Sequence, residues 1–294
     1  MASRDAARAE AYAAEHGLGR AHGSYEALLA DPDVDAVYIP LPNSLHVPWS
    51  VRALDAGKHV LCEKPLSRRV ADVSDAFDAA ESAGRLLMEG FMWRYHPATE
   101  LVMRLIGEGA IGRLRVVRAA FGFTLDPAAD NVRWSGELEG GALMDVGCYC
   151  VSALRLLAGE PTRVSAERID GGDGVDARMA GVLRFGDGVL GTFDCAFDVP
   201  YRAGIEVVGE TGTIVSLDPW HGGSPEVRVL RPEVDPEDVS VEAANPYGRE
   251  LEDFARAIRT GSPPRLDRDD AMGQARVIEA LYAAAGSGHA VEVT

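Results

Sequence analysis

The residue in this chain best suited to proton transfer is Lys64, one of only two lysines. The other is Lys58, and the rest of the 29 basic residues are arginine. Lys64 stands in Glu63-Lys64-Pro65, directly after a strand-like run of residues. Arginine keeps its proton in proteins, whereas lysine can release one when burial lowers its pKa. A rare lysine at the end of a buried strand therefore predicts a role in moving a proton.

A second candidate pair, Asp145 and Tyr149, lies in a glycine-rich segment. The two residues are four positions apart, so in a helix they share one face. An acid and a phenol that face a cleft can orient a hydroxyl group and take its proton. The ordinary alternative is that Asp145 caps the helix while Tyr149 packs with its hydroxyl satisfied. That alternative is the better one unless Lys64 lies beside the pair.

Polar residues follow the predicted strands at two places. One is Pro42-Asn43-x-x-His46, and the other is the segment that contains Lys64. Ligands of an α/β sheet usually bind at the carboxyl ends of its strands. For Asn43 and His46, an ordinary loop is an equally good interpretation. The second segment is the stronger prediction, because Pro65 restricts the backbone and is the kind of residue that can follow a cis peptide bond.

Short strand-like runs alternate with amphipathic helical runs over residues 1–95. This alternation is typical of βαβ units, which assemble into a parallel sheet. The sequence therefore predicts an α/β, Rossmann-like domain over this range. Strands are expected at 34–40, 59–62 and 86–88, and helices at 5–16, 24–30, 46–56 and 70–83.

The pattern changes after residue 113. A long strand is expected at 114–123, and a helix at 142–158. Between residues 162 and 230, several strand-like runs are separated by glycine-rich turns, which is typical of antiparallel sheets. Residues 96–294 are therefore predicted to form an α+β domain with a large open, mainly antiparallel sheet. The last helix is expected at 268–285, and we expect it to pack back on the first domain.

The composition of the chain excludes several classes of partner. A net charge of −17 and a pI near 4.8 would repel nucleic acid and disfavour an anionic membrane surface. Residues 1–16 lack the apolar core of a signal peptide, and no apolar run approaches the ~20 residues of a membrane span. The four cysteines have no zinc or redox spacing. We therefore expect a cytoplasmic protein with reduced, buried thiols and no metal site.

Four motifs, which include the two strand-end segments already described, occur in order along the chain. They are Pro42-Asn43-x-x-His46, Ala56-Gly57-Lys58-His59-Val60-x-x-Glu63-Lys64-Pro65, Phe91-Met92-Trp93-Arg94-Tyr95-His96-Pro97 and Gly140-Gly141-Ala142-Leu143-x-Asp145-x-Gly147-x-Tyr149. In this combination the chain resembles the glucose–fructose oxidoreductase/inositol dehydrogenase (Gfo/Idh/MocA) family, from residue 3 to the C-terminal helices. Trp93-Arg94 and the Asp145/Tyr149 pair are most similar to the branch with NADP-dependent D-xylose and glucose dehydrogenases and dihydrodiol dehydrogenases.

The resemblance implies an oxidoreductase that transfers a hydride between a nicotinamide coenzyme, NADP or else NAD, and a sugar or polyol carbon. Lys64 and Tyr149 would then handle the hydroxyl proton, with Asp145 orienting them. Two versions stay open. Lys64 could be the base if its pKa fell by about three units, at a cost of roughly 4 kcal/mol. Alternatively, a charged Lys64 lowers the pKa of Tyr149, which is then the base.

The resemblance also implies the residues that contact ligands and partners. Arg133 and Trp134 are candidates for the substrate pocket, although an ordinary surface role is equally good for both. Because relatives commonly dimerise through the open sheet, a homodimer or homotetramer is expected. The expected coenzyme contacts are Ser3, Arg4, Pro42, Asn43, His46, Glu63, Lys64, Pro65, Trp93 and Arg94.

The start of the chain matches the end of the second strand in the family. Ser3-Arg4 would contact a 2′-phosphate there, which favours NADP over NAD. The Gly-x-Gly-x-x-Gly motif that should precede it is absent, and the similar run at 107–112 lies between a helix and a strand, so we expect a turn there. About 30 residues, one strand-helix unit, are expected to be missing. We therefore expect an N-terminally truncated form that binds NADP weakly.

A misassigned start codon is the preferred reason for this truncation, ahead of a truncated gene product. A third explanation leads to another class of function, a non-catalytic sugar-binding or regulatory relative that lacks cofactor binding. A hydrolase or lyase that uses bound nicotinamide as a redox relay is a further alternative within the enzymes.

Overall fold

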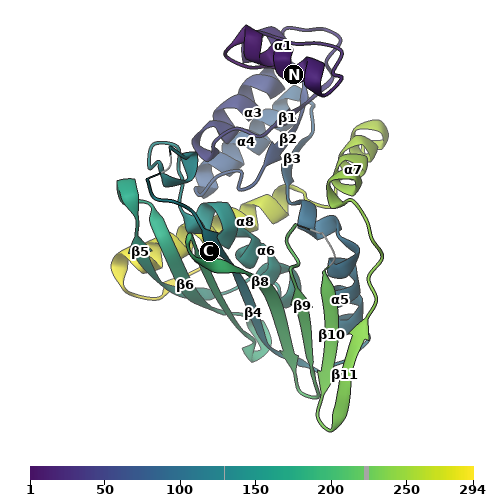
Figure 1. Cartoon of the computed structure of the whole chain (residues 1–294), viewed down its shortest axis with the longest axis vertical. Coiled ribbons are helices and arrows are strands. Elements are labelled where there is room, and N and C mark those ends of the chain that lie inside the picture. Colours follow the sequence, from purple (N-terminus) through teal and green to yellow (C-terminus); the bar gives the residue numbers. More distant parts are fainter. Residues whose placement is uncertain (129, 222–224) are drawn as a thin grey trace.

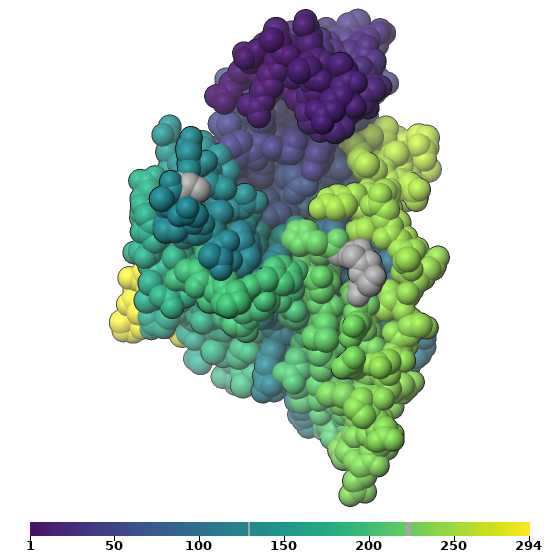
Figure 2. Space-filling view, viewed as in Figure 1, coloured from purple at the N-terminus to yellow at the C-terminus, as the bar shows by residue number. Residues whose placement is uncertain are grey.

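The computed structural model of the chain describes residues 1–128, 130–221 and 225–294 (Figure 1). Within these residues the strands form two sheets, one of three strands and one of nine. The space-filling view shows the N-terminal residues as a lobe at one end of the molecule, above the larger part that contains the second sheet (Figure 2). This two-part α/β and α+β architecture is the predicted fold class.

The smaller sheet is entirely parallel, with the strand order β1-β2-β3. Helices connect its strands, so the carboxyl ends of all three strands lie at one edge. Apolar residues of strands and helices form a core of their own under this sheet. The elements are α1 (Ala6–Glu15), α2 (Tyr25–Leu29), β1 (Ala36–Ile39), α3 (His46–Asp55), β2 (His59–Glu63), α4 (Val70–Ala83) and β3 (Leu87–Gly90).

The helix boundaries follow the capping residues of the sequence. Asp5 accepts a hydrogen bond from the backbone N–H of Arg8, and Ser24 accepts one from Ala27, so α1 and α2 begin where short polar side chains can satisfy free N–H groups. Helix α4 ends at Gly84, which adopts the left-handed conformation with φ of 60°. The helices predicted at 5–16, 24–30 and 70–83 are confirmed.

The larger sheet has the order β11-β10-β9-β8-β4-β7-β6-β5-β12, and its neighbours pair antiparallel except β4 and β7, which are parallel. Burial alternates along β6, so one face lies on helices while the other stays open. The predicted large open sheet is confirmed. Its strands are β4 (Leu114–Thr124), β5 (Arg163–Asp170), β6 (Asp176–Arg184), β7 (Leu190–Ala196), β8 (Asp198–Gly209), β9 (Thr213–Leu217), β10 (Glu226–Arg231), β11 (Val234–Val239) and β12 (Val291–Glu292).

Residues 222–224, part of the stretch expected to form strands, lie outside the described residues. The glycine-rich run at 107–112 is a turn between α5 (Pro97–Gly107) and β4, as expected. All four cysteines are free and buried. Among the described residues, no helix combines the length and apolar composition that crossing a membrane requires.

Helix α5 packs against β9 and β10, α6 (Cys148–Ala158) packs against β4 and β7, and α7 (Pro246–Thr260) packs against the 3₁₀ turn Met92–Tyr95 that follows β3. The last helix is α8 (Arg268–Ser287). Helix α8 packs against α4 on one side and against α6 and β5 on the other (Figure 1). Its Ala271 and Ala275 belong to the core of the parallel sheet, whereas Ile278 and Leu281 belong to the core of the larger one. The C-terminal helix therefore connects the two parts of the molecule.

Candidate active site

A cavity of about 690 Å³ lies where the carboxyl ends of β1 and β2 meet β4 and the segment before α6. Its volume is in the range of small-molecule and cofactor sites. Polar side chains predicted from the sequence come together here from positions far apart along the chain. The predicted residues that line it are Pro42, Asn43, His46, Glu63, Lys64, Arg133, Asp145 and Tyr149.

Lys64 is held in this cavity by the segment that carries Asp145 and Tyr149. Its Nζ donates a hydrogen bond to the backbone carbonyl of Asp145 at 2.6 Å and lies 3.8 Å from Oδ1 of the same residue. The ammonium group also lies over the ring of Tyr149, 4.8 Å from the ring centroid. The peptide bond that follows, Lys64–Pro65, is cis. The lysine, the acid and the phenol thus form one cluster.

The helix predicted at 142–158 begins with a π-helical turn, η4 (Leu143–Gly147), which the sequence did not reveal. The backbone N–H of Cys148 bonds to the carbonyl of Leu143, five residues back. Such turns leave a carbonyl free for an outside donor, and here the carbonyl of Asp145 receives Lys64. Tight packing accompanies the turn, because a Cβ at Gly147 would lie 2.7 Å from Sγ of Cys195.

The carboxylate of Asp145 joins two cations. Its Oδ2 accepts a hydrogen bond from Nε of Arg133 at 2.6 Å, while Lys64 faces its other oxygen. Arg133 lines the cavity, but its neighbour Trp134 does not: the indole N–H donates to the carbonyl of Asp126, and the ring packs on Phe197. The predicted substrate pair is therefore divided between the cavity and the surrounding core.

The charges in the cluster favour a protonated lysine. Burial lowers the pKa of Lys64, but neighbouring groups outweigh burial and hold that pKa above its ordinary value. Burial also raises the pKa of Tyr149 above its usual range, and the Lys64 cation opposes that rise. At neutral pH the pair is therefore an ammonium group beside a neutral phenol. Of the neighbours that raise the pKa of Lys64, Tyr149 and Cys148 do so only as phenolate and thiolate, whereas Asp145 and Glu63 do so as carboxylates.

His46 links the two strand-end loops. Its Nδ1 lies 2.8 Å from the carbonyl of Pro65, and its Nε2 lies 2.7 Å from the carbonyl of Leu41. Both partners are acceptors, so a neutral imidazole can donate to only one of them at a time. Burial lowers the pKa of His46, which favours this neutral form.

Asn43 and Glu63 also have partners within the protein. The side-chain amide of Asn43 donates to the carbonyl of Glu139 at 2.7 Å. Glu63 accepts a hydrogen bond from the hydroxyl of Tyr38 at 2.5 Å. Both residues are thus held at the cavity wall by contacts within the protein.

Several predicted coenzyme contacts lie away from this cavity. Trp93 is 1% exposed and packs edge-on against Trp220, with ring centroids 5.4 Å apart. Arg94 pairs with Asp270 at 3.2 Å. Ser3 accepts a hydrogen bond from the backbone of Asp5, and both Ser3 and the exposed Arg4 stand near the start of the chain. Contact of Ser3, Arg4, Pro65, Trp93 and Arg94 with a coenzyme stays a prediction.

An aromatic wall completes the cavity, and sequence reasoning missed it. Phe121 on β4 meets the ring of Tyr149 edge-on at 5.6 Å and stacks on Trp220 at 5.9 Å. The ring of His221 lies 5.8 Å from Tyr149, and burial lowers its pKa, with Lys64 adding to this effect. These residues belong to no sequence motif. They come from different strands and loops, and only the packing of the larger sheet brings them together. Tyr201 and Tyr247 line the cavity as well.

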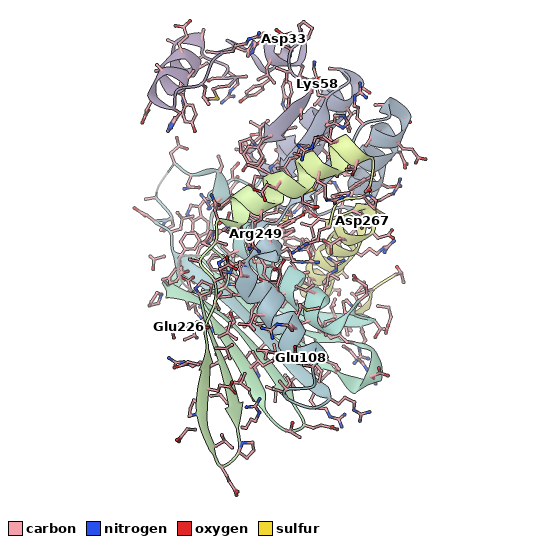
Figure 3. All side chains as sticks on the ribbon, turned by 90° about the vertical axis from the view of Figure 1, so that its right-hand side faces the viewer. Asp33, Lys58, Glu108, Glu226, Arg249 and Asp267 are labelled. Atoms are coloured by element: carbon pink, nitrogen blue, oxygen red, sulfur yellow. The ribbon has the colours of Figure 1, made fainter. Side chains whose placement is uncertain are left out.

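The second lysine, Lys58, lies elsewhere. It is near the top of Figure 3, at the end of the molecule away from the hairpin that carries Glu226. Lys58 is 7% exposed, and its Nζ donates to the carbonyl of Asp31 at 2.8 Å. No cluster of three or more His, Cys, Asp or Glu side chains in the described part of the chain could hold a metal ion.

Comparison with known proteins identifies the class. Residues 1–91 match the model of an oxidoreductase family with an NAD-binding Rossmann fold, and residues 99–215 match the GFO/IDH/MocA C-terminal domain. The chain therefore belongs to the Gfo/Idh/MocA family of oxidoreductases, and the resemblance of its four motifs to that family is confirmed.

Individual relatives agree with this assignment. The chain is 44% identical over 303 residues to D-xylose 1-dehydrogenase (NADP(+)) 2 of Haloferax volcanii, covering 100% of this chain and 91% of that protein. An aldose-aldose oxidoreductase from Caulobacter crescentus, solved with glycerol, gives a TM-score of 0.91 at 32% identity and covers 99% of this chain and 90% of its own. A 3-ketoreductase from Actinomadura kijaniata, solved with NADP and TDP-benzene, gives 0.90 at 32% identity, covering 96% and 88%.

Proposed function

We propose that this protein is an NADP-dependent dehydrogenase of sugars or polyols. The observation that carries the proposal is the position of the Lys64 amine over the ring of Tyr149, anchored by Asp145 inside a cavity at the strand ends. Such a cluster suits the transfer of a proton to or from a hydroxyl group. A nicotinamide coenzyme would supply the hydride acceptor or donor.

In the direction of oxidation, Tyr149 is the proposed base. As the phenolate, a form that the raised pKa of Tyr149 confines to alkaline pH, it takes the proton of the substrate hydroxyl, and the adjacent Lys64 cation stabilises it without giving up its own proton. In the direction of reduction, the phenol returns the proton to the new alkoxide. Asp145 keeps Lys64 in place and also holds Arg133 through Nε. Among the described residues no hydrogen-bond partner occurs for the other guanidinium N–H groups of Arg133, so these are the groups proposed to bind a substrate oxygen.

The residues that would hold the coenzyme lie at the carboxyl ends of the parallel strands, where α/β sheets bind nucleotides. Pro42, Asn43, His46 and Glu63 line the cavity there. We propose NADP rather than NAD, with Ser3 and Arg4 near a 2′-phosphate. This choice is supported by the NADP-dependent relative from Haloferax volcanii and by the NADP complex of the 3-ketoreductase.

The proposed substrate is a sugar or polyol. The cavity combines an aromatic wall with a small number of polar groups, which is typical of sites that stack on a sugar ring and fix its hydroxyls. The names of two relatives, a D-xylose dehydrogenase and an aldose-aldose oxidoreductase, support this class.

A panel of aldoses, polyols and diols tests the proposal. The protein is assayed for reduction of NADP⁺ and NAD⁺ by absorbance and fluorescence. We expect NADPH to form with at least one sugar or diol, and faster than NADH. Sugar binding by calorimetry without any turnover would contradict the proposal in favour of a binding protein. Substrate conversion without net NADPH would point to a redox relay.

We further propose that residues 1–95 form the coenzyme domain and residues 96–294 the domain for substrate binding and oligomerisation. The open face of the larger sheet exposes apolar side chains, including Val182 at 45%, and is hollowed by a depression of about 790 Å³. A second copy could cover this face in a homodimer or homotetramer in the cytoplasm. Light scattering should then give at least twice the mass of 31.4 kDa.

A further inference from the structure

The side chain of Gln274 connects helix α8 directly to the residue that precedes Tyr149 of the proposed catalytic cluster. Gln274 is 1% exposed and faces α6 from a helix that also packs on the parallel sheet. Its Nε2 donates a hydrogen bond to the carbonyl of Cys148 at 2.8 Å, and its Oε1 accepts one from Nη1 of Arg155 at 3.2 Å. A guanidinium can only donate and a carbonyl can only accept, so a single orientation of the amide satisfies both contacts.

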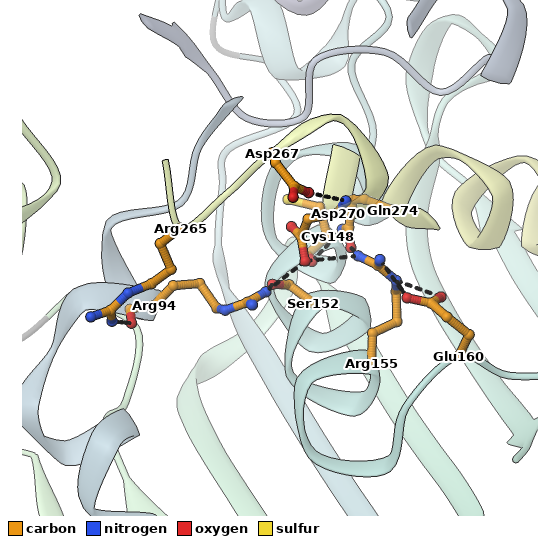
Figure 4. A network of polar contacts seen from close by, with 9 residues as sticks. All are labelled: Arg94, Cys148, Ser152, Arg155, Glu160, Arg265, Asp267, Asp270 and Gln274. Carbon is orange, nitrogen blue, oxygen red and sulfur yellow. Dashed lines mark hydrogen bonds and ion pairs between the residues drawn. The ribbon is translucent and has the colours of Figure 1, made fainter. Parts of the chain in front are cut away.

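Arg155 is itself buried and is fixed by a network of polar contacts (Figure 4). Its side chain is 3% exposed and donates to both carboxylate oxygens of Glu160 at 2.6 to 3.1 Å. Nη1 also lies 3.8 Å from Asp270, which pairs with Arg94 at 3.2 Å. The arginine is therefore held from several sides, and it fixes the amide of Gln274 in turn.

The backbone of α8 makes room for this arginine. A Cβ at Gly273 would lie 2.1 Å from Nη2 of Arg155. Glycine inside a helix lowers helix stability by about 1 kcal/mol relative to alanine, so the position needs a compensating reason. The close approach of Arg155 to Gly273 supplies it.

The carbonyl that Gln274 binds belongs to the peptide that directly precedes Tyr149. Cys148 is the first residue of α6, after the π-helical turn. Its thiol lies 3.5 Å from the carbonyl of Asp145, the same oxygen that accepts Lys64 Nζ. A shift of this peptide therefore moves Tyr149 relative to Lys64.

We infer that Gln274 is a positioning residue for the reaction: held by Arg155, it fixes the Cys148 carbonyl so that the ring of Tyr149 stays beside the ammonium of Lys64. It touches no reacting atom, and its effect on turnover rests on the proposed function. Through Gln274, the position of Tyr149, the proposed base, depends on the position of α8 and hence on that of the parallel sheet.

The two lysines of the chain permit a direct test without substrate or coenzyme. Protein labelled with ¹³C-lysine should give one set of Cε–Hε signals from Lys64 and one from Lys58. Because Lys64 lies over the ring of Tyr149, its Hε protons should be shifted upfield by the ring current. Tyr149→Leu identifies the signal and shows how it moves when the ring is lost, while the Lys58 signal serves as an internal reference.

Gln274→Glu is the main variant, because it keeps the size of the side chain and its pairing with Arg155 but removes the donor to the Cys148 carbonyl. We expect the Lys64 signal to lose much of its upfield shift while the Lys58 signal stays in place. A Lys64 signal that remains at its wild-type position would overturn the inference, whatever the activity.

Gly273→Ala gives a second test that leaves Gln274 itself intact. The new methyl group should displace Arg155 and shift the Lys64 signal in the same direction. Gly286→Ala is the matched control, because Gly286 lies in the same helix with nothing within 4 Å of an added Cβ. Equal spectra for the two alanine variants would contradict the role of Arg155.

Steady-state kinetics separate this inference from the proposed function. In an active enzyme, Gln274→Glu should lower kcat by about 10- to 100-fold, as small misplacements do, with little change in KM for the coenzyme. A wild-type enzyme inactive on every substrate would overturn the proposed function, and the Lys64 signal would still decide whether Gln274 positions the pair.

Discussion

Strand β2 is flanked by the two lysines of the chain, and their surroundings differ in kind. At the amino end, Lys58 Nζ donates to the carbonyl of Asp31 at 2.8 Å; at the carboxyl end, Lys64 Nζ donates to the carbonyl of Asp145 at 2.6 Å. Both side chains are well shielded, with Lys58 7% exposed and the side chain of Lys64 13% exposed. Of the two, Lys64 also lies beside the carboxylate of Asp145 and the ring of Tyr149, and it lines the cavity.

Burial and a carbonyl contact are shared by both lysines and so do not distinguish Lys64 from Lys58. The difference arises from the direction of the parallel strands, because the loops that bind ligands gather at their carboxyl ends. Lys58 lies at the opposite end, where its ammonium joins β2 to the loop after α2. We therefore expect substitutions at the two sites to affect different properties of the protein.

The largest effect is expected from removing the ammonium beside Tyr149. Lys64→Met should lower kcat by about 10²- to 10⁴-fold, because the phenolate loses the cation that stabilises it. Lys58→Met is the matched control and should leave kcat near the wild-type value. Steady-state kinetics with the best sugar or diol measure both, and a near-normal kcat for Lys64→Met would remove this residue from the mechanism.

A smaller kinetic effect is expected from the anchor of Lys64. Asp145→Asn keeps the shape of the side chain but removes the charge that holds Lys64 and Arg133. We expect kcat to fall by about 10- to 100-fold through loss of alignment. Asp78→Asn, which breaks the surface pair with Arg268, is the control and should not change turnover. Equal kinetics for the two variants would mean that Asp145 does not align the cluster.

At the other end of the strand the expected effect is on stability. Lys58→Met removes a charged donor from a buried contact, so the free energy of unfolding should fall by about 1.5–3 kcal/mol. Urea unfolding monitored by circular dichroism measures this change. An unchanged unfolding midpoint would indicate that the Asp31 carbonyl finds another donor and that Lys58 has no structural role.

A separate effect concerns the pH dependence of stability under the Lys64 loop. Glu89 on β3 accepts a hydrogen bond from the backbone of Leu66, and burial raises its pKa from 4.5 to about 8. Between these values the folded protein keeps a proton that the unfolded chain loses, so stability should fall as pH rises, by up to about 1.4 kcal/mol per pH unit.

Glu89→Gln should flatten this slope, since the amide does not titrate. Unfolding curves recorded across that pH window test the expectation. Burial also raises the pKa of Glu250 to about 8, so some slope should remain in the variant. A variant as pH-dependent as the wild type would show that Glu89 is ionised in the folded protein.

Local structure could be predicted well because its causes are local. Asp5 and Ser24 begin helices by accepting hydrogen bonds from N–H groups three residues ahead, and Gly84 ends one because it tolerates a positive φ. The alternation of strands and helices along the chain likewise predicts a parallel sheet, because each short connection is a local feature of the sequence. The π-helical turn before Cys148 was not predictable, because it depends on packing against Cys195 and on a donor from Lys64.

The candidate site was predictable only in part. Motif residues Lys64, Asp145 and Tyr149 do come together, whereas Trp93 of another motif is buried against Trp220 and does not line the cavity. A motif records that a residue type is required, but it does not state which surface the side chain faces. The aromatic wall could not be foreseen, since its members share no spacing in the sequence.

By itself, the sequence determined the two-part fold, the position of a rare lysine at a strand end and the acid and phenol that could serve it. These follow from periodicity, capping and residue type, which act over a few positions. Only the tertiary structure decided that Lys64, and not Lys58, meets Asp145 across 81 residues of chain. It also decided which charged groups surround Lys64 and that Gln274 bonds to the first residue of the neighbouring helix, because both depend on contacts from distant elements.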